Sequence, residues 1–276
     1  MPVHSILLEI VSLSIKPKQL LVNLLSVADQ PISAQQLIGI AELFDITPNN
    51  ARVTLARLTA DAMIESPQRG LYQLGPKARS LAEDISHWRE LESGVLAWQD
   101  DWIGVYIGTL GRTDRTGLRR RTRILSLAGF EPLEQNLWLR PNNLRGGVAA
   151  IRQRLYQLGL EECARVMRLD DFSDAEQQQA MQLWDLDKLS QCYREETAEM
   201  IEWMKMASGL SLEEGARQSF LLGDRVLRHI VFDPLLPSQM IDAALRSTYI
   251  DTMVRFDDVG NRFFRQLYRR LSEDAE

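Results

Sequence analysis

Near the N-terminus, apolar residues recur at helical spacing in three consecutive stretches, which begin after Pro17, Ser33 and Thr47. Ser33 is followed three residues later by Gln36, which is the pattern of a capping box. Thr47 followed by Pro48 fits an N-cap and a first helical position. The pattern predicts three helices, of which the second and the third are separated only by a short turn.

A short β-hairpin is predicted to follow the third helix. Residues 63–66 and 71–74 have strand-like composition and enclose the turn 67–70, which ends in an Arg-Gly pair. Helix, helix, tight turn, helix and hairpin is the order of a winged helix-turn-helix. In that fold the third helix enters the major groove of DNA, and the hairpin reaches the backbone or the minor groove.

The predicted solvent side of the third helix carries side chains suited to base-edge contacts. Arginine reads guanine, asparagine reads adenine, and threonine or valine contacts the methyl group of thymine. The candidate DNA-binding residues are Thr47, Asn49, Asn50, Arg52, Val53, Thr54, Arg57 and the hairpin residue Arg69. Two alternatives stay open for this segment: a plain helical core with a hairpin, and a winged-helix module that binds another protein.

The middle of the chain, from about residue 96 to 172, alternates strand-like and helix-like patterns. Residues 102–110 are aromatic and β-branched, and Asp114 is a candidate cap for a helix that Gly129 ends. The further expected elements are strand, strand, helix and strand, at about 130–134, 136–141, 148–158 and 163–169. The order βαββαβ is typical of a ferredoxin-like domain, which hosts many unrelated functions.

The remaining part, residues 173–276, is predicted to be almost entirely helical, with a proline-punctuated loop at 232–237. Its methionine and aromatic residues are expected mainly in a core, although such a lining also suits an apolar ligand. The predicted class is therefore α+β. The predicted domains are a winged helix-turn-helix with a connector helix, a ferredoxin-like middle domain and a helical C-terminal domain, at 1–95, 96–172 and 173–276.

The charged residues of the chain limit the kinds of nucleic-acid-binding protein that it can be. The net charge of −6 argues against a protein that coats nucleic acid indiscriminately, but a specific reader needs only a local basic surface. Residues 1–75 hold five Lys/Arg against six Asp/Glu, so a dimer is expected to add phosphate contacts.

Two cysteines make no disulfide framework, which indicates a reducing cytoplasm. No apolar run approaches the ~20 residues of a membrane span, and the N-terminal stretch, which carries Glu9, is interpreted as mature structure.

An arginine-rich segment lies in the middle block of this acidic chain. Residues 112–123 contain six arginines and one acid, Asp114. Two interpretations stay open: a solvated helix face, and a surface that contacts the phosphates of DNA or of a ligand.

Three groups of motifs resemble the PaaX-type transcriptional repressors. The first is the third predicted helix with the hairpin, where Val-Thr-Leu-Ala-Arg-Leu at 53–58 precedes Gly-Leu-Tyr-Gln-Leu at 70–74. The second is Leu-Ser-Leu-Ala-Gly-Phe at 125–130 with Trp-Leu-Arg-Pro at 138–141. The third is Arg228 with Asp-Pro-Leu-Leu-Pro at 233–237.

This resemblance implies a winged-helix domain, a middle domain similar to the Cas2 nuclease fold, and a helical C-terminal domain. It also implies a cytoplasmic homodimer that represses a catabolic operon and is released from operator DNA by an aryl- or acyl-CoA thioester. The stretch after Pro237 lacks the Trp-Pro-Gly of the family pattern, so the acyl group is not assigned. The arginines expected to engage the effector are Arg112, Arg119, Arg120, Arg121, Arg140 and Arg228.

The alternative from another class is a Cas2-like, metal-dependent nuclease. Such chemistry needs acidic ligands at the end of the first strand of the middle domain, but residues 107–111 contain none. His4, His87 and His229 are scattered and show no ligand spacing. Nucleophile-elbow, phosphate-loop and CxxC motifs are missing as well. We therefore expect no catalysis, no metal and no cofactor.

Overall fold

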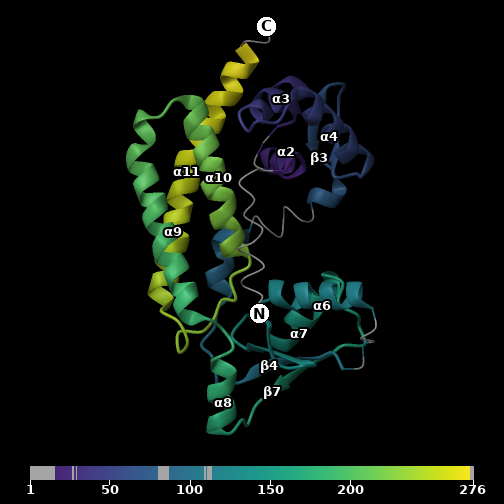
Figure 1. Ribbon diagram of the computed structural model, residues 1–276, viewed down its shortest axis with the longest axis vertical. Helices are drawn as coiled ribbons and strands as arrows, with labels where there is room; N and C mark the ends of the chain where they lie inside the picture. Colours follow the sequence, from purple (N-terminus) through teal and green to yellow (C-terminus); the bar gives the residue numbers. More distant parts are fainter. Residues whose placement is uncertain are drawn as a thin grey trace. The chain divides into compact units, whose positions relative to one another are not determined.

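The computed structural model describes residues 16–26, 28, 30–79, 87–108, 110 and 114–273 (Figure 1). Packing divides the chain into two compact units, each built from separate stretches. Unit 1 comprises Met1–Trp88, Ile201–Arg225 and Val254–Glu276, and unit 2 comprises Arg89–Met200 and Val226–Met253.

Three long helices contribute residues to both units: α9 (Leu186–Met206), α10 (Leu212–Val231) and α11 (Ala243–Glu273). The predicted helical character of the C-terminal part is confirmed. The predicted domain boundaries at 95 and 172 divide the sequence differently from this packing, and the three-domain division stays a prediction. Within the described residues, no helix combines the length and apolar character that a bilayer span requires.

Unit 1 begins with three helices and a small antiparallel sheet. The helices are α2 (Pro17–Ser26), α3 (Ala34–Glu42) and α4 (Pro48–Ala60), and the strands are β1 (Ile32–Ser33), β2 (Ile64–Glu65) and β3 (Leu71–Leu74). The strand order is β1-β3-β2, with Ile32 opposite Tyr72 and Ile64 opposite Leu74. The predicted hairpin is confirmed as β2 and β3, whereas β1 was not predicted.

The predicted helix caps are also confirmed. Ser33 and Gln36 form a reciprocal capping box at the start of α3. The side chain of Thr47 accepts a hydrogen bond from the backbone N–H of Asn50, and Pro48 occupies the first turn of α4. These side chains satisfy N–H groups that have no partner within the helix, and they fix where each helix begins.

The core of unit 1 combines the two ends of the chain. The apolar faces of α2, α3 and α4 meet in a cluster that includes Leu20, Leu37 and Leu58, all nearly inaccessible to solvent. Ala216 of α10 and Leu267 of α11 belong to the same cluster. Helices from the C-terminal part therefore complete the core beneath the predicted DNA-reading helices.

Unit 2 contains a four-stranded antiparallel sheet and two helices in the order β4, α6, β5, β6, α7, β7. Their bounds are Trp102–Tyr106, Arg115–Leu127, Glu131–Glu134, Leu137–Pro141, Gly147–Gln157 and Arg165–Leu169. The strand order is β5-β6-β4-β7. Helices α6 and α7 cover one face of the sheet (Figure 1), where Leu125 and Leu155 pack against Ile103 and Val166.

Two expectations in this region need correction. The strand predicted for residues 102–110 ends at Tyr106, where both neighbouring strands begin: Tyr106 pairs with Leu137, the first residue of β6, and with Arg165, the first residue of β7. The connector predicted as a helix is helical at residues 76–79, lies outside the described residues at 80–86, and continues as the 3₁₀ helix η1, His87–Gly94, where an α-helix was expected.

Aromatic side chains link the sheet of unit 2 to the segment that follows it. Trp102 of β4 stacks on Trp184, with ring centroids 6.1 Å apart, and meets Trp98 edge to face at 5.0 Å. The Trp102 indole N–H donates to Gln177 of α8 (Asp174–Met181) at 2.8 Å. This cluster joins α8 and the start of α9 to the sheet.

Candidate functional site

Helix α4 has one buried and one exposed face. Ala51, Leu55 and Leu58 are buried, because they follow the helical period toward the core. The opposite side carries the predicted DNA-binding residues. Thr47, Asn49, Asn50, Arg52, Val53 and Arg57 are exposed, and Thr54 is half-buried.

The exposed face of α4 combines polar, charged and apolar groups. Val53 is 40% exposed, which is high for a β-branched apolar residue and leaves its methyl groups available for contact. The Thr54 hydroxyl donates weakly to the Asn50 side chain at 3.4 Å. Among the described residues, none forms an ion pair with Arg52 or Arg57. The face therefore presents two guanidinium groups that external acceptors can reach.

The hairpin places a third arginine at an exposed tip. Residues 66–70 are all exposed, and Gly70 adopts φ +82°, a left-handed conformation that favours glycine. Arg69 stands beside Gly70 in this turn. At the base of the hairpin, by contrast, Arg79 forms an ion pair with Glu65, and Gln73 donates to the same carboxylate at 2.7 Å. Arg69 is thus the basic side chain that the tip itself offers.

Helix α6 separates its arginines into two groups. Arg115, Arg119, Arg120 and Arg123 are exposed, although Arg120 also donates to the carbonyl oxygen of Gly159. Arg121 is buried and contacts Glu161 at 2.9 Å, and this hydrogen-bonded guanidinium holds the pKa of Glu161 below its usual range. Arg112 lies outside the described residues.

Arg140, predicted to bind an effector, lies in the interior of unit 2. Its guanidinium donates to the carbonyl oxygens of Ala128 at 2.6 Å and Pro234 at 3.2 Å. Burial lowers the pKa of Arg140 to about 10, which leaves the group charged near neutrality. Arg140 therefore connects the loop at residues 232–237 to the residue that follows α6, through hydrogen bonds to both. Arg228 lies half-buried in the last turn of α10.

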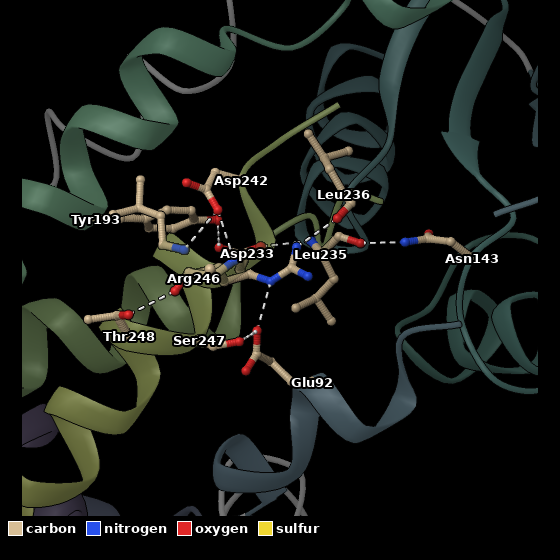
Figure 2. Close-up of polar contacts among 12 residues, drawn as sticks. Glu92, Asn143, Tyr193, Asp233, Leu235, Leu236, Asp242, Arg246, Ser247 and Thr248 are labelled. Carbon is tan, nitrogen blue, oxygen red and sulfur yellow. Dashed lines mark hydrogen bonds and ion pairs between the residues drawn. The ribbon is translucent and has the colours of Figure 1, made fainter. Parts of the chain in front are cut away.

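The loop that follows α10 is held by a network that the sequence did not reveal (Figure 2). The Asp233 carboxylate accepts from the backbone N–H of Leu235 at 2.7 Å and from the hydroxyl of Tyr193. The side chain of Asn143 donates to the Leu235 carbonyl at 2.6 Å. Leu235 has φ +51°, an unusual conformation for leucine, and these contacts hold it there.

Arg246, at the start of α11, completes the network. Its guanidinium donates to the Leu236 carbonyl at 2.7 Å and to Glu92 of η1 at 3.1 Å, and Ser247 donates to the same Glu92 oxygen at 3.1 Å (Figure 2). Burial raises the pKa of Asp233. The proline spacing of the loop is visible in the sequence, but its partners come from α9, α11, β6 and the residue Asn143. Glu92 of η1 joins the network through Arg246.

Comparison with known proteins finds a family model that matches the C-terminal region. Residues 184–276 match the family model described as the PaaX-like protein C-terminal domain. The chain carries a PaaX-like domain. This PaaX-like region contains α9, α10, α11 and the loop of Figure 2, and the match confirms the resemblance for the third motif group, Arg228 with residues 233–237. It also favours the class of transcriptional regulators.

A solved structure with a similar fold is the uncharacterized protein Rv0674 from Mycobacterium tuberculosis. It has 21% sequence identity to this chain and a TM-score of 0.58. The match covers 91% of this chain and 99% of that chain, so the likeness of fold extends well beyond the PaaX-like region. No curated protein matches the sequence.

Proposed function

We propose that the chain is a DNA-binding transcriptional regulator whose reader is a winged helix-turn-helix formed by α3, α4 and the β2–β3 hairpin. One observation carries the proposal: α4 buries Ala51, Leu55 and Leu58 and exposes an opposite face with Asn50, Arg52 and other base-contacting types. A helix that exposes such a face beside a basic hairpin tip has the composition of a major-groove reader.

Direct binding to DNA tests this proposal. The probe is a labelled duplex from the region upstream of the chain's own coding sequence, titrated with the full-length protein at fixed salt. Replacing Arg52 and Arg57 together by Ala is expected to weaken binding by roughly a hundredfold, because a good bidentate base contact contributes about 1–3 kcal/mol of discrimination. The matched control replaces Arg165 and Arg194, two exposed arginines of unit 2, by Ala.

The control double variant removes the same net charge and is expected to bind within a few fold of the wild type. Equal affinities for both double variants would remove α4 from the DNA interface. If DNA binding is lost only together with the thermal transition, the protein has unfolded, so a melting curve accompanies each titration. Single variants, Arg52→Lys and Arg57→Lys, then separate bidentate base contacts from simple charge.

We further propose that the regulator is a homodimeric repressor of a catabolic operon, released by an acyl-CoA thioester. The low positive charge of residues 1–75 favours two readers per complex. The exposed residues Arg115, Arg119 and Arg123 of α6 recur every four positions and share one face, so they form a row suited to phosphates. Because Arg121 and Arg140 are engaged within the fold, the exposed arginines are the stronger effector candidates.

Thermal melting with defined compounds tests the effector. Phenylacetyl-CoA, acetyl-CoA, free CoA and free phenylacetate are compared, because a ligand of the native state raises the melting temperature. The Arg119→Ala/Arg123→Ala protein is expected to lose a shift that the Arg165→Ala/Arg194→Ala protein keeps. If no CoA compound shifts the wild type, the effector proposal fails. If instead the α6 variant binds the DNA duplex more weakly, these arginines belong to the DNA surface.

A further inference from the structure

Three side chains of unit 2 form a cluster with the chemistry of a metal site. Cys192 and Glu196 lie four residues apart on α9 and therefore share one face of that helix. His229, in the last turn of α10, meets them. Its Nδ1 lies 3.5 Å from the Cys192 sulfur and 2.9 Å from a carboxylate oxygen of Glu196.

The distances suit a small, tetrahedral cation. One ligand atom from each residue, sulfur, nitrogen and oxygen, lies within 4.8 Å of the others. Ligand atoms bonded to zinc at its usual lengths of ~2.0–2.3 Å are roughly 3.5 Å apart in a tetrahedron. Small side-chain adjustments would therefore bring all three atoms into bonding distance of one ion.

A second layer of hydrogen bonds already orients the cluster. The Tyr249 hydroxyl, on α11, donates to the second carboxylate oxygen of Glu196, and it lies 3.3 Å from the carbonyl oxygen of Val226. Such outer contacts fix the direction of a ligating carboxylate and are a regular part of protein metal sites. Glu196 is buried, and its two carboxylate oxygens already face His229 and Tyr249.

We propose that Cys192, Glu196 and His229 bind a zinc-class divalent cation, with a fourth position left for water or another small ligand. Sulfur, nitrogen and oxygen donors together match borderline-soft ions, whereas calcium and magnesium prefer oxygen alone. Without the ion, burial raises the pKa of the Cys192 thiol to about 12, so the thiol is protonated. Binding releases this proton to solvent, and the neutral imidazole carries its own proton on Nε2. The ion would join α9 to α10.

Cobalt(II) is the probe for the site. The full-length protein is reduced, stripped with a chelator and titrated with cobalt(II), whose four-coordinate thiolate complexes absorb in the visible and show a sulfur-to-metal charge-transfer band. We expect one cobalt per chain with both features, and bleaching when zinc(II) is added. The Cys192→Ser and His229→Gln proteins should lose these bands, and Cys163→Ser should keep them. Cys163 is exposed and is the other cysteine of the chain.

Melting in chelator and in zinc supplies the second readout. Zinc is expected to raise the melting temperature of the wild type and of Cys163→Ser, but not of Cys192→Ser. If the wild type shows no cobalt–thiolate band, or if Cys192→Ser keeps it, the proposal is wrong and the cluster is a hydrogen-bonded contact among three helices. The wild-type spectrum decides this even if a variant fails to fold. No DNA is used, so the result is independent of the proposed function.

Discussion

The guanidinium of Arg217, on α10, donates to the carbonyl oxygen of Leu43 at 2.6 Å and to the Asp45 carboxylate at 2.8 Å. Leu43 is the C-cap residue of α3, where carbonyl groups lack partners within the helix. Asp45 belongs to the turn before α4 and has φ +61°. Arg217 thereby holds both sides of the turn that joins the two helices of the reader.

Replacing Arg217 by Ala is expected to lower the free energy of unfolding by about 1 kcal/mol, since a capping hydrogen bond is lost at a partly solvated position. Asp45→Asn removes only the exposed ion pair and should cost less than about 0.5 kcal/mol. Urea denaturation of both proteins checks this order. A larger loss in Asp45→Asn than in Arg217→Ala would assign the stabilisation to the ion pair instead.

The cap of α4 gives a second prediction. Thr47→Ala removes the acceptor for the Asn50 N–H, and the expected loss is about 1 kcal/mol. Thr47→Ser keeps a hydroxyl in the same place and should stay close to the wild type. The denaturation midpoints of the wild type, Thr47→Ala and Thr47→Ser, measured in parallel, test this expectation. Equal midpoints for the Ala and Ser proteins would show that the cap contributes nothing to stability.

Replacing the buried Arg140 is expected to affect stability much more than replacing the exposed Arg119. Arg140→Ala leaves carbonyl groups of Ala128 and Pro234 without this donor, and we expect a loss of roughly 2–4 kcal/mol. Arg119→Ala, on the exposed side of α6, should change stability by less than about 0.5 kcal/mol. Thermal or chemical unfolding of the two proteins measures the difference. A mild effect at Arg140 would reopen its assignment to an effector.

The carboxyl group of Glu131, on β5, is expected to make the stability of the folded protein depend on pH. Burial raises the pKa of this carboxyl group from 4.5 to about 7. Because the folded protein holds the proton more tightly than the unfolded chain, the contribution of Glu131 to stability is fully present below about pH 4.5. It is lost as the pH rises through about 7. Glu131→Gln should remove this dependence and melt higher than the wild type at about pH 8.

Glu134, exposed on the same strand, supplies the matched control for that measurement. Melting temperatures of the wild type, Glu131→Gln and Glu134→Gln are compared from about pH 5 to about pH 8. Only Glu131→Gln is expected to flatten the profile. Identical profiles for all three proteins would show that Glu131 is ionised in the folded state without penalty.

Local signals explain what the sequence predicted well. The caps at Ser33 and Thr47, the hairpin turn at Gly70 and the Asp114 cap of α6 depend on residues within a few positions of one another, and the structure has them all. The exposure of the α4 face followed from helical periodicity alone. The two-residue strand β1 was missed because a run that short shows no period.

Long-range partners explain what the sequence did not predict. The contacts of Arg140 with Pro234 and of Tyr193 with Asp233 join residues that are far apart in the chain. For Arg121 a signal did exist. It shares a helical face with Ile124 and Leu125, three and four positions later, so its burial could have been distinguished from the exposure of Arg119.

The N-terminal and C-terminal helices of unit 1 share one core, which limits how the chain can be cut into fragments that fold. Ala216, Phe264 and Leu267 pack against the same apolar side chains as the N-terminal helices. A truncated fragment ending near residue 95 would expose that surface to water and would be prone to aggregate. Domain-swap or fusion experiments that transfer the DNA reader to another protein should therefore retain the second half of α11, even though it is far from the reader in the sequence.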